Sequence, residues 1–175
     1  MDHFVPTDPA KLAELPEDPS GWLAARTVFP LDSRDDAAGE GVWQPNAWLH
    51  FSDDPVDSAT LFRDTGVDMV AQGLTTVFRT RDTAGAARAI DRIEDNSRAL
   101  PGVQPISGVT GLPTARCFER VQGAVADSLP LPIQQMWWHF KCIARADRYA
   151  FTAFSADAND AKQQIAAQYR ILAGR

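Results

Sequence analysis

Residues 134–156, QQMWWHFKCIARADRYAFTAFSA, contain the pattern that decides the fold. Apolar side chains alternate with polar ones over most of this stretch and aromatic residues are frequent, which is typical of two half-buried β-strands. A turn at residues 146–147 would join the strands into a hairpin. Cys142 would then lie opposite Phe151 on one apolar face. Because Ala-Asp is a poor two-residue turn, a longer loop with a shifted register remains an alternative.

Helix and strand signals extend from this hairpin toward both ends of the chain. Asp and Thr residues stand where helix N-caps are expected, and glycines stand where helices should stop. The predicted elements are a strand at 47–51, a helix from Asp54 to Gly66, a bent or bulged strand at 67–80 interrupted by Gly73, a helix capped by Asp82 or Thr83, a short extended piece at 103–107, a strand at 115–121, the hairpin, and a helix capped by Asp157 that ends near Gly174.

This order of elements predicts an α+β fold with a mostly antiparallel sheet and helices packed on one face. A doubly wound fold would need strands and helices to alternate to the end of the chain. The length of 175 residues fits one hydrophobic core. We expect residues 1–46, with their scattered prolines and a polar loop, to be an arm that packs on the domain formed by residues 47–175.

Composition and charge limit the partners of the chain. The net charge of −6 argues against nucleic acid and anionic membrane surfaces as main partners. No apolar stretch approaches the roughly 18 residues that a membrane span needs. Near the start of the chain, where a signal peptide would have an apolar run, the sequence instead carries the prolines Pro6, Pro9, Pro16 and Pro19.

The two cysteines, Cys117 and Cys142, lack the C-x-x-C spacing of zinc or thioredoxin sites. They either pair or remain as two buried thiols. A pair is the favoured interpretation, because both residues lie in predicted strands and a disulfide forms where two cysteines face one side of adjacent strands. A disulfide would indicate an oxidising compartment.

None of the sequence motifs of common catalytic sites is present. The sharpest catalytic candidate is His50 with Ser52 and a carboxylate at Asp53 or Asp54. Neighbours this close on a strand cannot easily converge as a triad, and Asp54 is needed as a helix cap. The acidic run that continues to Asp57 lacks the glycine turn of a calcium loop. We therefore expect no catalytic residue, no metal and no cofactor.

The aromatic run at residues 136–140, MWWHF, is the strongest candidate for a binding surface. Strand alternation turns Trp138 and Phe140 inward and leaves their neighbours outward. An exposed tryptophan is uncommon enough to suggest an interface, although cover by a loop or by the arm is the favoured explanation. The candidate surface consists of Trp137, His139, Lys141 and Arg145.

Several stretches carry a resemblance to a known family: Leu49–Val56 (LHFSDDPV), Gly66-Val67-Asp68, Gly111-Leu112-Pro113, Ala115-Arg116-Cys117, and Gln164–Tyr169 (QIAAQY). The chain resembles the C-terminal domain of uncharacterised actinobacterial, chiefly mycobacterial, envelope lipoproteins. This resemblance implies an exported protein, anchored through a lipidated cysteine that this chain lacks, with a preceding domain also absent from it. It also implies a disulfide between Cys117 and Cys142. It provides no catalytic residues.

Together these observations predict a non-enzymatic, extracytoplasmic binding or sensor-like domain of the cell envelope, with a lipidic envelope ligand as one option. The alternative is a protein-interaction module that docks through Trp137, His139 and the nearby basic residues. A hydrolase that uses His50 or His139 is the third and least favoured interpretation. The expected partner is a lipid or an envelope protein, with membrane attachment only through the lipid anchor. The oligomeric state is left open.

Overall fold

The computed structural model of the chain describes residues 41–43, 55–72, 75–121 and 138–174. The predicted strand at 47–51 and the predicted cap Asp54 lie outside these ranges. The described elements are β1 (Gly41–Trp43), α5 (Pro55–Thr65), β2 (Val67–Gln72), β3 (Thr75–Thr80), α6 (Thr83–Arg98), β4 (Val103–Ile106), β5 (Arg116–Arg120), β6 (Phe140–Ala146), β7 (Tyr149–Ser155) and α9 (Ala158–Leu172).

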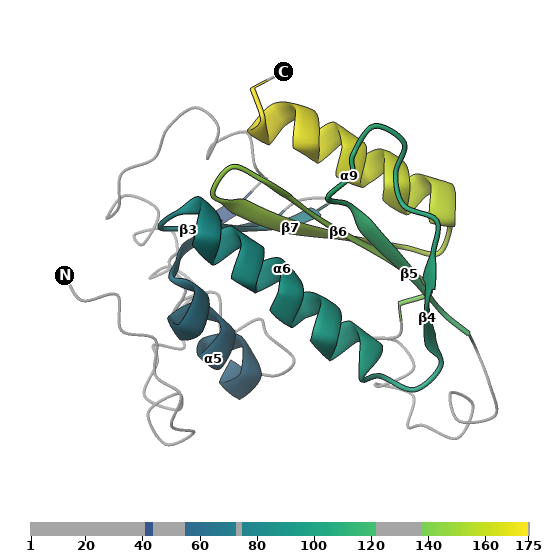
Figure 1. The fold of residues 1–175 in the computed structure, drawn as a ribbon, viewed down its shortest axis with the longest axis horizontal. Helices are drawn as coiled ribbons and strands as arrows, with labels where there is room; N and C mark the ends of the chain where they lie inside the picture. The colour runs from purple at the N-terminus through teal and green to yellow at the C-terminus, as the bar shows by residue number, and fades with distance from the viewer. Residues whose placement is uncertain (1–40, 44–54, 73–74, 122–137, 175) are drawn as a thin grey trace.

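The strands form one antiparallel sheet in the order β1-β2-β3-β7-β6-β5-β4 (Figure 1). Every neighbouring pair of strands is antiparallel. The pair β3–β7 joins the first half of the chain to the second. The predicted α+β class with a mostly antiparallel sheet is therefore confirmed. Of the predicted arm, residues 41–43 form the edge strand β1, and the rest lies outside the described part of the chain.

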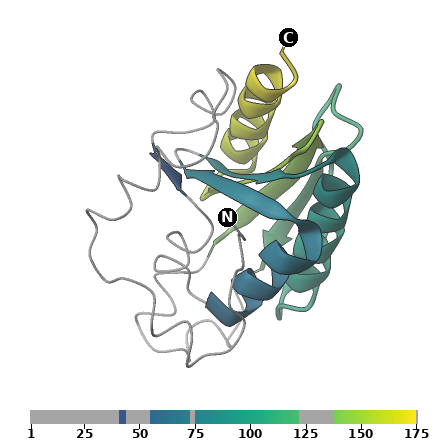
Figure 2. The same cartoon turned by 90° about the vertical axis from the view of Figure 1, so that its left-hand side faces the viewer.

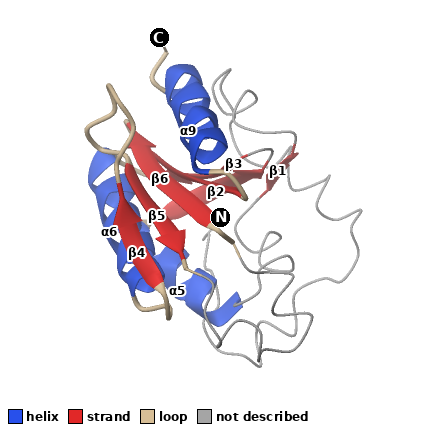
Figure 3. Cartoon of the chain, turned by 90° about the vertical axis from the view of Figure 1, so that its right-hand side faces the viewer, coloured by secondary structure: helices blue, strands red, loops and turns tan. Residues whose placement is uncertain are grey.

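Helices cover both faces of this sheet, so the expectation of helices on one face is wrong (Figures 2 and 3). One core, which includes Phe62, Ile90 and Ala150, lies between the sheet and the helices α5 and α6. A second core, which includes Phe151 and Ile165, lies between the sheet and α9. The physical reason is that β7 is buried on both sides, since its first five residues are all buried. A sheet with one wet face would leave half of these residues in water.

The predicted hairpin is present, but its register differs by two residues. Cys142 pairs with Ala153, and Ala146 pairs with Tyr149, so the turn consists of the two residues between them. The first of these, Asp147, has a φ of 52°. Aspartate tolerates this left-handed conformation better than most residues, which is why the turn forms here. Because a shift of two residues conserves the alternation, the predicted buried face is correct.

The single bent strand predicted for residues 67–80 is wrong, because the chain turns back on itself as the hairpin of β2 and β3. Strands in globular proteins rarely exceed ten residues, and the turn lets both halves pair within the sheet. A bulge does occur at Asp68, between the pairs Val67↔Thr80 and Met69↔Arg79. The carboxylate of Asp68 accepts a hydrogen bond from Nε of the buried Arg79 at 2.7 Å.

The predicted helix boundaries agree closely with the structure. Asp82 caps α6 by accepting a hydrogen bond from the backbone N–H of Gly85, and Asp157 caps α9 through the N–H of Asp160. Gly66 ends α5 with a φ of 74°, a conformation that glycine adopts without steric cost. The apolar residues that α6 and α9 bury recur at helical spacing, with Ala86, Ile90 and Ile93 on α6 and Ala161, Ile165 and Leu172 on α9.

Cys117 and Cys142 form the disulfide that the sequence favoured. They lie directly opposite each other on β5 and β6, with their Cα atoms 4.1 Å apart, and both are buried in the core beneath α9. The bond links residues 25 positions apart and so closes the long connection between the two strands.

We expect the double variant Cys117→Ala/Cys142→Ala to lose about 3.5 kcal/mol of unfolding free energy, because the unfolded chain regains the entropy of a closed loop of this length. Urea unfolding of the oxidised protein and of the variant measures the difference. Reduced wild-type protein should behave like the variant. A loss below about 1 kcal/mol would show that the disulfide contributes little to stability.

We also expect Gly85→Ala to destabilise the protein by about 1–3 kcal/mol through overpacking, although alanine favours helix. A Cβ atom at this position would lie 2.4 Å from the carbonyl oxygen of Thr65, where α5 approaches α6. The exposed neighbour Ala84 provides the control, since Ala84→Gly should cost only the helix propensity of about 1 kcal/mol. An increase in melting temperature for Gly85→Ala would contradict the close approach of α5 to α6 at this position.

Candidate functional site

A group of cationic and aromatic side chains lies on the α6 side of the sheet, where β5, β6 and β7 reach one end of α6. We call it the cationic–aromatic cluster and define it as Arg120, Trp138, Lys141 and Phe154. The register of the hairpin places Lys141 of β6 directly opposite Phe154 of β7. Trp138 precedes β6 and packs against the core beneath α5 and α6. Arg120 ends β5 and donates its backbone N–H to the carbonyl oxygen of His139 at 2.8 Å.

Lys141 is the centre of the cluster. Its ammonium group lies 5.7 Å from the ring centroid of Trp138 and 5.3 Å from that of Phe154. It donates a hydrogen bond of 2.9 Å to Oγ of Ser97, in the last turn of α6. Ser97 in turn donates its hydroxyl hydrogen to the carbonyl oxygen of Ile93. The hydroxyl is thereby oriented so that its oxygen faces the lysine.

Burial lowers the pKa of Lys141 to about 8, because a charged ammonium group is costly away from water. The residue still carries its proton at neutral pH. Within the described part of the chain, no carboxylate forms an ion pair with it. The acidic residue Glu94 on α6 pairs instead with Arg98 and Arg116. Within the described ranges, the positive charge of Lys141 is offset by a hydroxyl oxygen and by two aromatic rings.

The two rings form the apolar part of the cluster. Their centroids lie 6.4 Å apart at an angle of 47°, which is within the range of favourable aromatic pairs. Phe154 is 44% exposed. The guanidinium of Arg120 lies 6.0 Å from the ring centroid of Trp138, so a second cation shares that ring. The arrangement combines an accessible aromatic ring with two cations, and it can attract a molecule that has both an apolar part and a negative charge.

The structure does not bring the predicted surface residues together as one exposed patch. Trp137 lies outside the described residues. His139, Lys141 and Arg145 are each partly buried, and the side chain of Lys141 is directed at α6. Lys141 and Arg145 are four residues apart on one strand, a separation of about 13 Å. The expectation that Trp138 and Phe140 face one side also fails, because Phe140 packs against the core beneath α9.

The sequence pattern did not predict Phe154 and Arg120 as members of the cluster. The error in the predicted register hid the pairing of Lys141 with Phe154, since a shift of two residues moves each residue to a different partner. A turn at Asp147 and Arg148 would have revealed it.

Other chemistry finds little support in the described ranges. The catalytic candidates His50, Ser52, Asp53 and Asp54 lie outside them. In the described part, no group of histidine, cysteine and acidic residues is arranged to hold a metal ion. None of the helices there is both long enough and apolar enough to cross a membrane.

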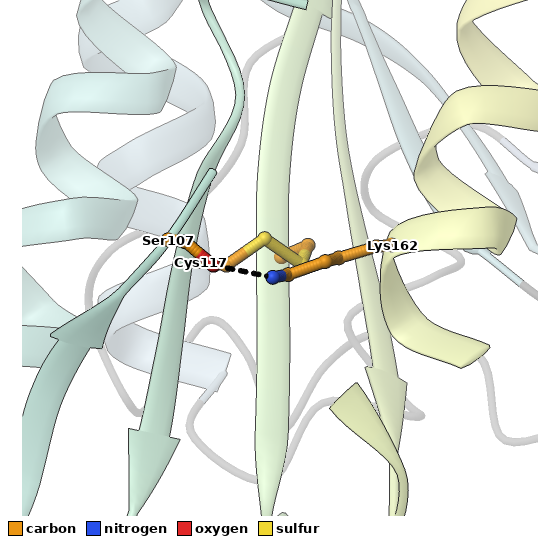
Figure 4. The surroundings of a disulfide bond; sticks show 4 residues. Ser107, Cys117 and Lys162 are labelled. Atoms are coloured by element: carbon orange, nitrogen blue, oxygen red, sulfur yellow. Dashed lines mark hydrogen bonds between the residues drawn. A yellow bond between two sulfur atoms is a disulfide. The ribbon is translucent and has the colours of Figure 1, made fainter. Parts of the chain in front are cut away.

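An open groove of about 510 Å³ lies on the opposite side of the sheet, between α9 and the loop that follows β4. Lys162 of α9 spans it and donates a hydrogen bond of 2.8 Å to Oγ of Ser107 (Figure 4). The disulfide of Cys117 lies beside this contact.

Comparison with known proteins identifies the family of the chain. The family described as the C-terminal domain of a domain of unknown function, DUF7373, matches residues 23–175. The chain belongs to this family. No curated protein and no solved structure gave a match. The DUF7373 C-terminal match includes residues 23–46, which the sequence pattern had assigned to an arm, and residues 41–43 of that stretch form β1 of the sheet.

We expect Lys141→Met to stabilise the DUF7373 domain at pH 7 by up to about 3 kcal/mol, because the variant removes a charge that is costly to bury. The pKa of Lys141 is lowered to about 8 from 10.5, so the unfolded chain binds more protons between these values. The stability of the wild type therefore rises with pH across this window, and the advantage of the variant should shrink from pH 8 and vanish above about pH 10.5.

Urea unfolding at pH 7, 9 and 10.5 measures this change. Lys162→Met, the same substitution on α9, reports the effect of removing a positive charge as such. An advantage of Lys141→Met that stays constant from pH 7 to pH 10.5 would contradict the proposed cost of burial.

Proposed function

We propose that this domain is a non-enzymatic, extracytoplasmic binding module of a cell-envelope lipoprotein, and that it binds an anionic lipid through the cationic–aromatic cluster. The observation that carries the proposal is the position of Lys141. A protonated lysine lies between two aromatic rings, without a carboxylate partner in the described part of the chain, and one of the rings is exposed. Such a charge is stabilised further by any ligand that brings a negative group to it.

The chemistry of the cluster supports the choice of ligand. Phe154 offers an apolar surface that an acyl chain can cover, and covering it removes apolar area from water. Lys141 and Arg120 offer two positive charges to an anionic headgroup. A neutral lipid would use the ring alone, and a small inorganic anion would use the cations alone. An anionic lipid uses both.

The disulfide supports the proposed location. Cys117 and Cys142 are paired, and disulfides persist mainly in oxidising compartments outside the cytoplasm. The location therefore rests on the disulfide and on the sequence resemblance together.

Protein docking through Trp137, His139, Lys141 and Arg145 is less well supported. Trp137 lies outside the described residues, and Lys141 and Arg145 are about 13 Å apart on β6. A docking surface needs several exposed side chains next to one another. The lipid proposal needs one exposed aromatic side chain, Phe154, and the ammonium group of Lys141 at 5.3 Å from its ring centroid.

Native mass spectrometry of the oxidised protein with lysophosphatidylglycerol, below its micellar concentration, tests the proposal. We expect a one-to-one adduct, and a weaker one with zwitterionic lysophosphatidylcholine, because only the first carries a net negative charge. Phe154→Ser should reduce the affinity for lysophosphatidylglycerol about tenfold, which corresponds to the loss of part of one buried aromatic contact.

Ile171 provides a matched control, since it is 43% exposed and Phe154 is 44% exposed, and Ile171 lies on α9 at the other face of the sheet. Ile171→Ser should leave the affinity unchanged. Equal binding of the two lysolipids, or an equal loss in both variants, would argue against a site at the cluster. A protein that stays a bare dimer would favour the docking alternative.

A further inference from the structure

The groove between α9 and the loop after β4 is lined almost entirely by polar and small residues. Its walls come from the first turns of α9 and from the loop after β4, and its volume is about 510 Å³, within the range of small-molecule sites. The lining residues are Ser107, Gly108, Val109, Thr110, Asn159, Lys162, Gln163 and Ala166. No aromatic ring and no carboxylate is among them.

Lys162 gives this groove a positive charge in a fixed place. One of its three N–H groups bonds to Ser107, which directs the ammonium group across the groove (Figure 4). Within the described part of the chain, no carboxylate pairs with Lys162. The nearest acidic residue in sequence, Asp160, accepts hydrogen bonds from Ser155 and Gln164 instead.

The remaining polar residues suit a ligand rich in hydroxyl groups. The side-chain amides of Asn159 and Gln163 each donate and accept hydrogen bonds, and so do the hydroxyls of Ser107 and Thr110. Sugar hydroxyls also do both. A lysine next to such groups adds a preference for one negative charge.

The loop wall is held in place by its own hydrogen bonds and by the disulfide. The N–H of Leu112 bonds to the carbonyl of Val109, and that of Ala115 bonds to the carbonyl of Leu112. Ile106, which precedes the loop, pairs with Cys117 of the disulfide. A wall fixed in this way loses little conformational entropy when a ligand binds.

We propose that this groove is a second binding site, for a saccharide that carries one anionic group, with Lys162 as the anion-binding residue. The site lies on the α9 face, opposite the cationic–aromatic cluster, and does not rest on the function proposed for that cluster. The negative group is a carboxylate or a phosphate, both of which a lysine binds.

Three monosaccharides of similar shape test the proposal: glucose, glucuronic acid and glucose 6-phosphate. Titration into the uniformly ¹⁵N-labelled full chain, followed by amide chemical shifts, gives both the affinity and the place of binding. We expect the two anionic sugars to shift the amide resonances of residues 107–110 and 159–166. Glucose should bind there about tenfold more weakly, because it lacks the charged hydrogen bond. The better of the two anionic sugars identifies the type of charge.

Lys162→Gln should reduce the affinity for both anionic sugars to that of glucose. Arg88→Gln removes the same charge from an exposed position on α6 and should have no effect. Ala166→Leu leaves the charge unchanged but fills part of the groove, and it should abolish binding of all three sugars. Thermal unfolding of each variant shows whether it is folded.

Three results would overturn this inference. The first is the absence of shifts at millimolar concentrations of both anionic sugars. The second is a set of shifts centred on residues 138–141 and 154, which would place the binding at the other cluster. The third is an affinity for the anionic sugars that Lys162→Gln does not change.

Discussion

Burial of β7 on both faces is the constraint on which the rest of the structure depends. This strand lies at the centre of the sheet, between β3 and β6, and its first five residues are shielded from water. Tyr149, Phe151 and Ala153 require a cover on one side, and α9 provides it. Ala150 on the other side is covered by the layer of α5 and α6. Covering both faces of β7 therefore requires α5 and α6 from the first half of the chain and α9 from the second half. The two halves must fold together for this reason.

Burial of the sheet on both faces also explains why the lysine contacts lie near the ends of the helices. A lysine in the middle of a doubly covered sheet would be too costly, whereas Lys141 near the start of β6 reaches Ser97 and two aromatic rings. Lys162 lies near the start of α9 and reaches Ser107 in a similar way. Both lysines of the described part thus bond to a serine hydroxyl, on opposite faces of one sheet. The disulfide joins β5 to β6, the strand that carries Lys141, and closes the long connection between these two strands.

Local signals in the sequence predicted local structure well. Asp82, Asp157 and Gly66 act as the caps and stops that their types suggested, because such signals depend only on neighbouring backbone groups. The pairing of Cys117 with Cys142 was favoured for a related reason, since alternation placed both on one face. The predicted site was less accurate. A register error of two residues hid Phe154, and alternation could not predict that Trp138 turns away from Phe140 before β6 begins.

The sequence by itself determined the approximate ends of the helices, the buried face of the β6–β7 hairpin and the favoured disulfide. All of these follow from the period of apolar residues and from the conformational preferences of single residues. Only the tertiary structure decided that helices cover both faces, that residues 67–80 form two strands, and that Lys141 meets Ser97, Trp138 and Phe154. The reason is that an alternating pattern records whether a side chain is buried, whereas the partner that buries it comes from a distant part of the chain.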